Sequence, residues 1–155
     1  MIKNVSVILG ILFCLLTNHS FSQAIEEIEG LYYTTAGDLY TGTYTEFYES
    51  GTKRIEMNLE EGKRNGKITL FFENEEVQEV RSYVAGLMDG MWITWNDKSV
   101  KIAEANYKGN RKHGKWYIWD DNGVKRYEME YSEGDKIGTW YIWDADGNLI
   151  KERKF

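Results

Sequence analysis

The chain has 155 residues and a formal net charge of −6, and it holds 6 Trp, 11 Tyr, 6 Phe and 15 Gly but no proline. Average usage would give about eight prolines; their absence, with so many aromatic residues, excludes disordered linkers and proline-rich ligands and favours uninterrupted β-ladders. The negative charge disfavours nucleic acid and anionic membranes as partners, because both are bound through cationic faces.

The first 22 residues have the layout of a secretory signal peptide. A basic start at Met1-Ile2-Lys3 precedes an apolar run from Val5 to Leu16, and small residues follow at Ser20 and Ser22. This run is short of the roughly 20 residues that span a bilayer, which leaves a retained membrane anchor as the weaker alternative. We therefore expect residues 1–22 to be removed and the chain to be exported to the periplasm or the extracellular space.

Removal of this segment has two consequences for the chemistry of the chain. The only cysteine, Cys14, lies within it, so residues 23–155 can form no disulfide and offer no thiolate. Lys3 is lost as well, which brings the net charge to −7.

Residues 23–29 are acidic, and we expect a disordered or helical lead-in there. Around Ala36-Gly37, an atypical opening hairpin is predicted to begin the domain that covers residues 30–155.

From this point a repeat of 24 residues organises the chain. Glycines recur at that spacing five times without an insertion, and three further columns keep an apolar or aromatic character two, five and seventeen residues after each glycine. The unit starts are Gly42, Gly66, Gly90, Gly114 and Gly138. Other structural positions of the repeat are Trp92, Trp116, Trp140, Tyr83, Tyr107 and Tyr131.

Each unit is predicted to form a β-hairpin. Residues 115–119 are aromatic and β-branched, which favours a strand, and Asp121-Asn122-Gly123 supplies the positive φ angles of a tight turn. Residues 125–132 then alternate between apolar and charged side chains, as half-buried strands do. The sequence therefore predicts an all-β fold in which five hairpins and the opening hairpin stack into one elongated antiparallel sheet, roughly 50 Å long at about 4.8 Å per strand.

This pattern resembles the MORN repeat. Residues 107–119, followed by Asp121-Asn122-Gly123, are most similar to the bacterial variant labelled YwqK-like antitoxin, and the resemblance covers about residues 30–155. It implies a scaffold of stacked hairpins used for protein–protein contacts; lipid binding has also been proposed for such repeats. Three residues depart from the pattern. Glu75 and Ser99 replace the glycine in the middle of the hairpin, and Gly109 lies one position early, so we expect looser turns there.

Residues capable of catalysis or metal binding are sparse. His113 is the only histidine after residue 22. Catalytic triads and zinc sites usually require a histidine together with further histidine, cysteine or other partner side chains, so we interpret His113 as a solvated loop residue. Residues 144–148 and 120–123 resemble calcium loops, but the glycine and glutamate that an EF-hand requires are missing, and the hairpin-turn interpretation explains the same residues. We expect no enzyme, no cofactor and no metal site.

The aromatic columns are the feature that could bind a ligand. Trp116 and Trp119 are three residues apart, so they point to opposite faces of the sheet unless a bulge intervenes. Either both faces are partly covered, or one aromatic ladder lines an open groove, and exposed aromatic stripes mark binding sites. Our candidate binding residues share one face. They are Trp95, Tyr117, Trp119, Tyr141 and Trp143.

Two functions remain open at this point. The first is a non-catalytic exported scaffold that binds a protein partner through the aromatic surface. The alternative is a module that binds carbohydrate or peptidoglycan with the same Trp/Tyr ladder.

Overall fold

A computed structural model describes residues 24–155, so the segment interpreted as a signal peptide lies outside the described residues. The described part contains strands and no helix. The strands are β1 (Ile25–Ile28), β2 (Leu31–Thr34), β3 (Gly42–Phe47), β4 (Lys53–Glu60), β5 (Lys63–Phe71), β6 (Val77–Val84), β7 (Leu87–Met88), β8 (Gly90–Trp95), β9 (Lys101–Lys108), β10 (Arg111–Lys112), β11 (Gly114–Trp119), β12 (Lys125–Ser132), β13 (Asp135–Trp143) and β14 (Leu149–Lys154).

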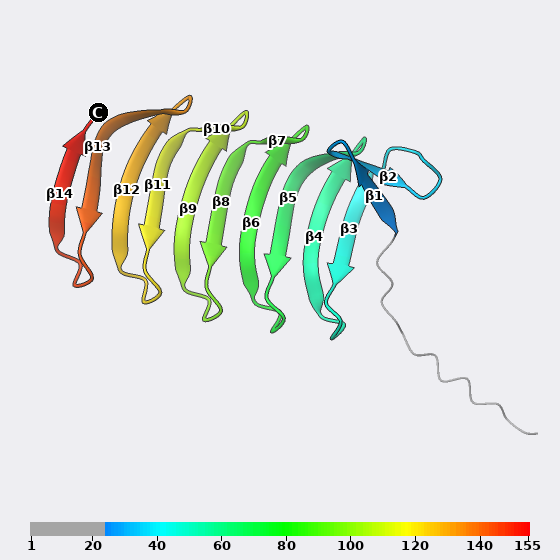
Figure 1. Cartoon of the computed structure of the whole chain (residues 1–155), viewed down its shortest axis with the longest axis horizontal. Coiled ribbons are helices and arrows are strands. Elements are labelled where there is room, and N and C mark those ends of the chain that lie inside the picture. Colours follow the sequence, from blue (N-terminus) through cyan, green and yellow to red (C-terminus); the bar gives the residue numbers. More distant parts are fainter. Residues whose placement is uncertain (1–23) are drawn as a thin grey trace, which may run out of the picture.

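Ten of these strands lie side by side in the order β14-β13-β12-β11-β9-β8-β6-β5-β4-β3, with β7 and β10 paired to the ends of β6 and β9. Every pairing is antiparallel, and the sequence order is kept along the sheet. Each 24-residue unit is one hairpin, so units 1 to 5 are β3–β4, β5–β6, β8–β9, β11–β12 and β13–β14 (Figure 1). The predicted fold class is confirmed. One detail differs: the opening hairpin expected around Ala36-Gly37 has a single isolated bridge, between Tyr33 and Leu39, and its strand β2 pairs with β1 in a separate two-stranded sheet rather than joining the stack.

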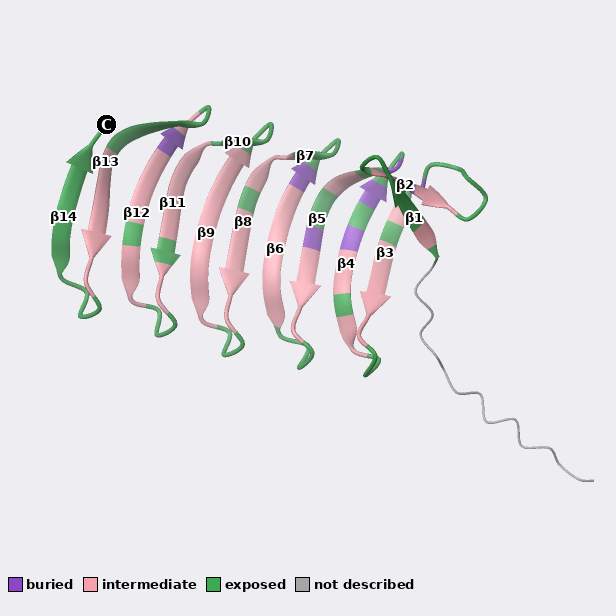
Figure 2. Cartoon of the chain, viewed as in Figure 1, coloured by how far each residue is buried: buried purple, intermediate pink, exposed green. Residues whose placement is uncertain are grey.

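The sheet is one layer thick over most of its length. None of the large side chains of residues 24–155 is fully buried, and most strand residues are half-buried (Figure 2). The main cluster of buried residues lies at the N-terminal end of the sheet and contains Tyr32, Tyr40, Met57, Leu59, Ile68 and Tyr83. The hydrophobic core is therefore local, and the remaining units depend on contacts along the sheet.

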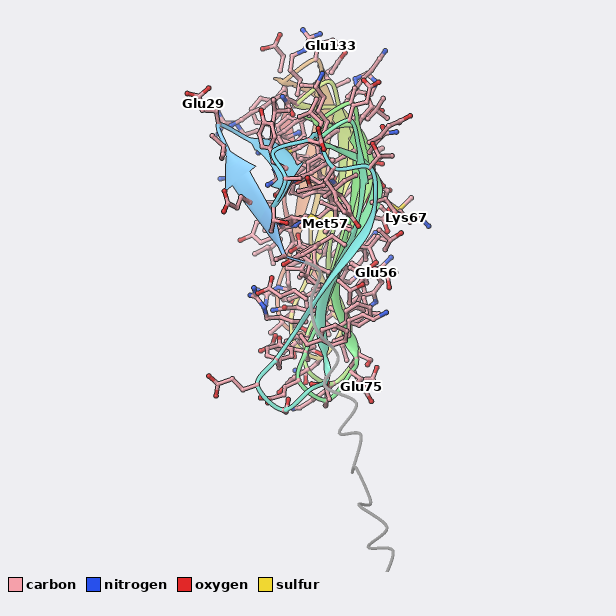
Figure 3. The ribbon with its side chains drawn as sticks, turned by 90° about the vertical axis from the view of Figure 1, so that its right-hand side faces the viewer. Glu29, Glu56, Met57, Lys67, Glu75 and Glu133 are labelled. Atoms are coloured by element: carbon pink, nitrogen blue, oxygen red, sulfur yellow. The ribbon has the colours of Figure 1, made fainter. Side chains whose placement is uncertain are left out.

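A hairpin outside the repeat covers this N-terminal end. The acidic segment that we expected to be a helical or disordered lead-in instead forms strand β1, which pairs with β2 through a turn at Glu29-Gly30. Figure 3 shows this hairpin standing against one face of the sheet, on the side opposite Glu56 and Lys67. The expectation was wrong because Ile25 finds an apolar surface to pack on, beside Tyr32. The hairpin is thus part of the fold.

The turns of the hairpins share one geometry, including those with atypical residues. The five mid-unit turns place Gly51, Glu75, Ser99, Gly123 and Gly147 at positive φ. Each of these turns is closed by the same pair of backbone hydrogen bonds; around Glu75, for example, the Glu75 N–H donates to the Phe72 carbonyl over 3.0 Å. The expectation of looser turns at Glu75 and Ser99 is therefore wrong, because these residues accept the left-handed conformation rather than open the turn.

The turns that connect successive units have two consecutive residues at positive φ, as two-residue hairpin loops require. They are Glu61-Gly62, Ala85-Gly86, Gly109-Asn110 and Glu133-Gly134. In the third of these, glycine takes the first position and asparagine the second. Asparagine tolerates the left-handed region, so the displaced Gly109 leaves the register of the sheet unchanged.

Replacing Glu75 by glycine is expected to stabilise the protein by about 0.5–1 kcal/mol. Glu75 is exposed and sits at φ 68°. The left-handed conformation costs a residue with a Cβ roughly 1–2 kcal/mol. This cost exceeds the roughly 0.5–1 kcal/mol by which glycine destabilises the fold through the greater conformational entropy of the unfolded chain. Urea denaturation measures the difference. Glu73→Gly in the same turn is the matched control, and it should be neutral or destabilising; equal effects of both substitutions would contradict the assignment of strain to Glu75.

Candidate functional site

Alternate residues of each strand supply two different aromatic surfaces. In β11, Trp116 opposes Met129 of the next strand, and Tyr117 opposes Glu128. A register shift follows Ile118, but the extra residue lies on the partner strand, so Trp119 stays on the side of Tyr117. The two tryptophans of a unit therefore lie on opposite faces. We name the face that carries Trp116 the ladder face and the face that carries Trp119 the lysine face.

The ladder face holds a continuous row of stacked rings. Units 3, 4 and 5 each contribute a tryptophan from the first strand and a tyrosine or phenylalanine from the second strand or its end, and successive ring centroids lie 4.6 to 5.6 Å apart. Contacts of this kind each contribute about 0.5–1.5 kcal/mol beyond the burial of area. The row consists of Tyr83, Trp92, Tyr107, Trp116, Tyr131, Trp140 and Phe155.

The tryptophans of this row are also fixed by hydrogen bonds. Each indole N–H donates to the backbone carbonyl ten residues earlier, over 3.2 Å for Trp92, 2.9 Å for Trp116 and 3.2 Å for Trp140. In unit 4, the Asn106 carbonyl also accepts the backbone N–H of His113 over 2.9 Å, so the indole of Trp116 is its second donor. A bond from the ring to the backbone of the neighbouring unit fits a structural role for these rings.

Cations lie over the rings of the ladder face. Lys112 lies 4.5 Å from the Trp116 ring centroid and 4.9 Å from that of Tyr131, and Lys136 lies 4.8 Å from that of Trp140. Arg64 takes the same place at the other end, 5.8 Å from the Tyr83 ring. These positions are whole numbers of repeat periods apart, and such contacts contribute about 0.5–1 kcal/mol at exposed sites.

The lysine face carries the five candidate binding residues. Tyr117 and Trp119 stack at 5.6 Å with an interplanar angle of 32°, and Tyr141 and Trp143 stack at 5.9 Å and 33°. Trp95 lies at the repeat position of Trp119 and Trp143, one unit before Trp119. The structure thus brings the candidates onto one surface, as the alternation predicts, and all five are half-buried.

Charged side chains cover most of these rings. Lys101 lies over Trp119 at 4.6 Å, and Lys125 lies over Trp143 at 5.0 Å. Each lysine is held by a glutamate three residues on, over 2.8 Å to Glu104 and 3.1 Å to Glu128. Burial acts to raise the pKa of Glu128, but hydrogen bonds from Lys125 and Lys115 outweigh it and lower the pKa. The Glu128 carboxylate therefore stays ionised and holds Lys125 over the ring of Trp143.

Among residues 24–155, Trp95 and Tyr141 have no cation over their rings. For Trp95 the reason is that valine, Val77, occupies the position of the covering lysine in the unit before it. Glu76, Val77, Trp95 and Ser99 line a shallow hollow of about 190 Å³ there. The Ser99 hydroxyl donates to Glu76 over 2.7 Å, so the carboxylate is already engaged.

A larger hollow that sequence reasoning missed lies on the ladder face at the C-terminal end. It is open, has a volume of about 330 Å³, and its surface is mostly apolar. Ile118 and Tyr127 are about 40% exposed within it, at 39% and 40%. The residues around it are Ile118, Tyr127, Met129, Lys136, Trp140, Tyr141, Ile142, Lys151, Arg153 and Phe155.

The remaining chemical candidates have local partners. The His113 Nδ1 atom lies 3.5 Å from the Glu133 carboxylate on a half-exposed side chain. In the suspected calcium loop, Asp144 Oδ1 accepts the backbone N–H groups of Asp146 and Asn148 over 3.0 and 2.8 Å, and these bonds lower the pKa of Asp144. Its carboxylate thus closes its own turn. Across residues 24–155, no three His, Cys, Asp or Glu side chains gather as a metal site would need.

Comparison with known proteins bears on the repeat. Within residues 24–155, no helix is long and apolar enough to cross a membrane. No curated protein matches the chain. The family described as MORN repeat variant matches residues 40–61 and 112–133. Each match begins two residues before a unit glycine, Gly42 or Gly114, so both fall in the same phase of the repeat. The two matches and the sheet of stacked hairpins together support a MORN-repeat family for this chain.

Proposed function

We propose that the protein is a non-catalytic, exported scaffold that binds a protein partner through its extended aromatic surface. The observation that carries this proposal is a sheet of one layer with aromatic rows on both faces. Within residues 24–155, only its N-terminal end is covered by another part of the chain. Repeat proteins use extended surfaces of this kind for binding. The resemblance to antitoxin-type repeats adds one class of partner, a toxic protein that the scaffold would block.

The lysine face is better suited to a protein than to a sugar. Sugar-binding aromatic platforms need open ring faces, whereas Lys101 and Lys125 lie over Trp119 and Trp143. The same mixture of rings, cations and carboxylates matches the anchors of protein interfaces, where aromatic residues are enriched and charges set the register. Carbohydrate binding remains the alternative, and the uncovered ring of Trp95 is the observation that favours it.

Photo-crosslinking in the producing cells tests the proposal. A benzophenone amino acid placed at Tyr141 on the lysine face, or at Tyr127 on the ladder face, should give a protein adduct of one size that recurs between preparations. The same probe at Ser50, an exposed turn residue of unit 1, is the control. Adducts no stronger at Tyr141 and Tyr127 than at Ser50 would contradict the proposal.

A second measurement separates the alternative. If the protein binds glycans, soluble oligosaccharides should shift the tryptophan fluorescence and insoluble polysaccharide should retain the chain, and Trp95→Ala should abolish both effects. A protein-binding scaffold should show neither. Glycan binding that depends on Trp95, in the absence of any recurrent protein adduct, would replace the first function by the second.

A further inference from the structure

The chain itself shows one kind of segment that the ladder face accepts. At units 1 and 2 this face is covered by the β1–β2 hairpin, whose Ile25 and Tyr32 pack near Tyr44 and Met57. Arg64 closes the contact: it donates to the Tyr32 hydroxyl over 2.5 Å and forms an ion pair with Glu27 over 3.3 Å. The covering strand β1 has the sequence Ile-Glu-Glu-Ile, so it is both apolar and acidic.

The same surface recurs three repeat periods later, where no other segment of the described residues 24–155 covers it. A shift of 72 residues carries Tyr44, Ile55, Met57 and Arg64 onto Trp116, Tyr127, Met129 and Lys136. Of these, Tyr127, Met129 and Lys136 line the C-terminal hollow. The hollow is thus the repeat equivalent of the surface beneath the hairpin, with aromatic or aliphatic residues at the packing positions and a cation at the position of Arg64.

Charge distinguishes the two ends of the ladder face. Around the C-terminal hollow stand Lys136, Lys151 and Arg153. Within residues 24–155 none of these three forms an ion pair with a carboxylate, whereas Arg64 has Glu27. An excess of unpaired positive charge on an acidic protein of net charge −6 attracts a negatively charged partner and repels a second copy of the same face.

From this equivalence we propose that the ladder face of units 4 and 5 is the docking site for an acidic, amphipathic β-strand or hairpin of a partner protein. The aliphatic side chains of that strand pack on Ile118, Tyr127 and Met129, and a carboxylate pairs with Lys136 as Glu27 pairs with Arg64. This inference rests on the proposed function, since it names the surface and the chemistry of the protein partner.

The experiment uses the full chain and, as a probe, the acidic β1–β2 hairpin, which already packs on the ladder face at units 1 and 2. A fluorescein-labelled peptide of residues 24–34, which spans β1 and β2, is titrated with the protein, and fluorescence anisotropy reports binding. We expect saturable binding that Lys136→Glu weakens at least tenfold. Lys67→Glu is the matched control because it makes the same charge change on the opposite face (Figure 3), and it should leave the affinity unchanged. Circular dichroism verifies that both variants keep the sheet.

A second variant and a second peptide make the test independent of one substitution. Ile118→Lys should also abolish binding, because it places a charge in the apolar part of the hollow. A peptide in which Glu26, Glu27 and Glu29 are lysine should not bind, since its charges match those of the site. If Lys136→Glu and Lys67→Glu bind the peptide of residues 24–34 with equal affinity, the peptide binds elsewhere, for example on units 1 and 2 by exchange with the chain's own hairpin. That result would overturn the inference.

The other anionic surface that could meet these cations is a membrane. Vesicles of phosphatidylcholine with and without phosphatidylglycerol are therefore tested with the same variants. Sedimentation with the anionic vesicles that is lost in Lys136→Glu, without peptide binding, would overturn the inference in favour of lipid. A recurrent crosslink from Tyr141 without peptide binding would also overturn it, yet it would leave the proposed function standing. Absence of any crosslink is the separate result that contradicts the proposed function.

Discussion

A chain that lacks residues 90–113 is expected to fold into the same sheet with one unit fewer. The deletion joins Asp89 to Gly114, a junction equivalent to the native link between His113 and Gly114. Tyr83 then stacks on Trp116 in place of Trp92, so the ladder continues without a mismatch. Because the stability of repeat proteins is roughly a sum over units and their interfaces, unfolding in urea should stay cooperative, with a slope reduced in proportion to the shorter chain.

Removal of half a unit, residues 90–101, should have a far larger effect. This deletion takes away β8 and the following turn and leaves β9 directly after the return turn. Each strand from β9 to β14 would then run in the direction opposite to its direction in the native sheet. Strand β9 therefore cannot both pair with β6 and place Tyr107 in the ladder. We expect the cooperative transition to be lost for units 3 to 5. Equal damage from the two deletions would contradict the assignment of the 24-residue unit as the structural repeat.

Trp116→Ala is expected to destabilise the protein by about 3 kcal/mol, at the lower end of the values for removing a large aromatic side chain. The ring of Trp116 contacts Tyr107 at 5.1 Å and Tyr131 at 5.4 Å, and its N–H donates to the Asn106 carbonyl over 2.9 Å. Its loss therefore interrupts the row on both sides and leaves the Asn106 carbonyl with the His113 N–H as its remaining donor. Urea denaturation of the parent and the variant gives the difference in the free energy of unfolding.

Two further variants identify the cause of this effect. Trp116→Phe keeps a ring but removes the N–H donor, so it should cost about 1 kcal/mol, the usual contribution of one hydrogen bond. Trp119→Ala, on the lysine face, removes a ring that stacks on Tyr117 alone, and it should cost less than half as much as Trp116→Ala. A larger loss from Trp119→Ala would mean that the lysine face, not the ladder face, supports the stack.

Much of this fold follows from the sequence for a simple physical reason. A fixed period of 24 residues forces each unit to repeat the strand and turn positions of the one before, so Gly42 and Gly114 must begin equivalent strands. Alternation along a strand then assigns Trp116 and Trp119 to opposite faces. Period and alternation are local properties, and both can be read without knowledge of distant contacts.

What the sequence did not reveal depends on contacts between distant segments. Strand β1 has the same Glu-Gly turn as the connections between units, at Glu29-Gly30 and Glu133-Gly134, and this signal could have identified a hairpin before residue 31. That the hairpin covers the ladder face only at its N-terminal end could not be read, because it depends on the contact of Arg64 with Glu27, 37 residues away. The exposed hollow near Tyr127 follows from that one-sided cover.

Small-angle X-ray scattering of the chain in dilute solution tests most directly the claim on which both proposals rest, a single-layered sheet with open faces. Ten strands side by side at about 4.8 Å each give a ribbon with a radius of gyration of about 17 Å, against about 14 Å for a compact domain of the same length. We predict the larger value together with the mass of a monomer. The compact value, or the mass of a dimer whose aromatic faces cover each other, would contradict the account.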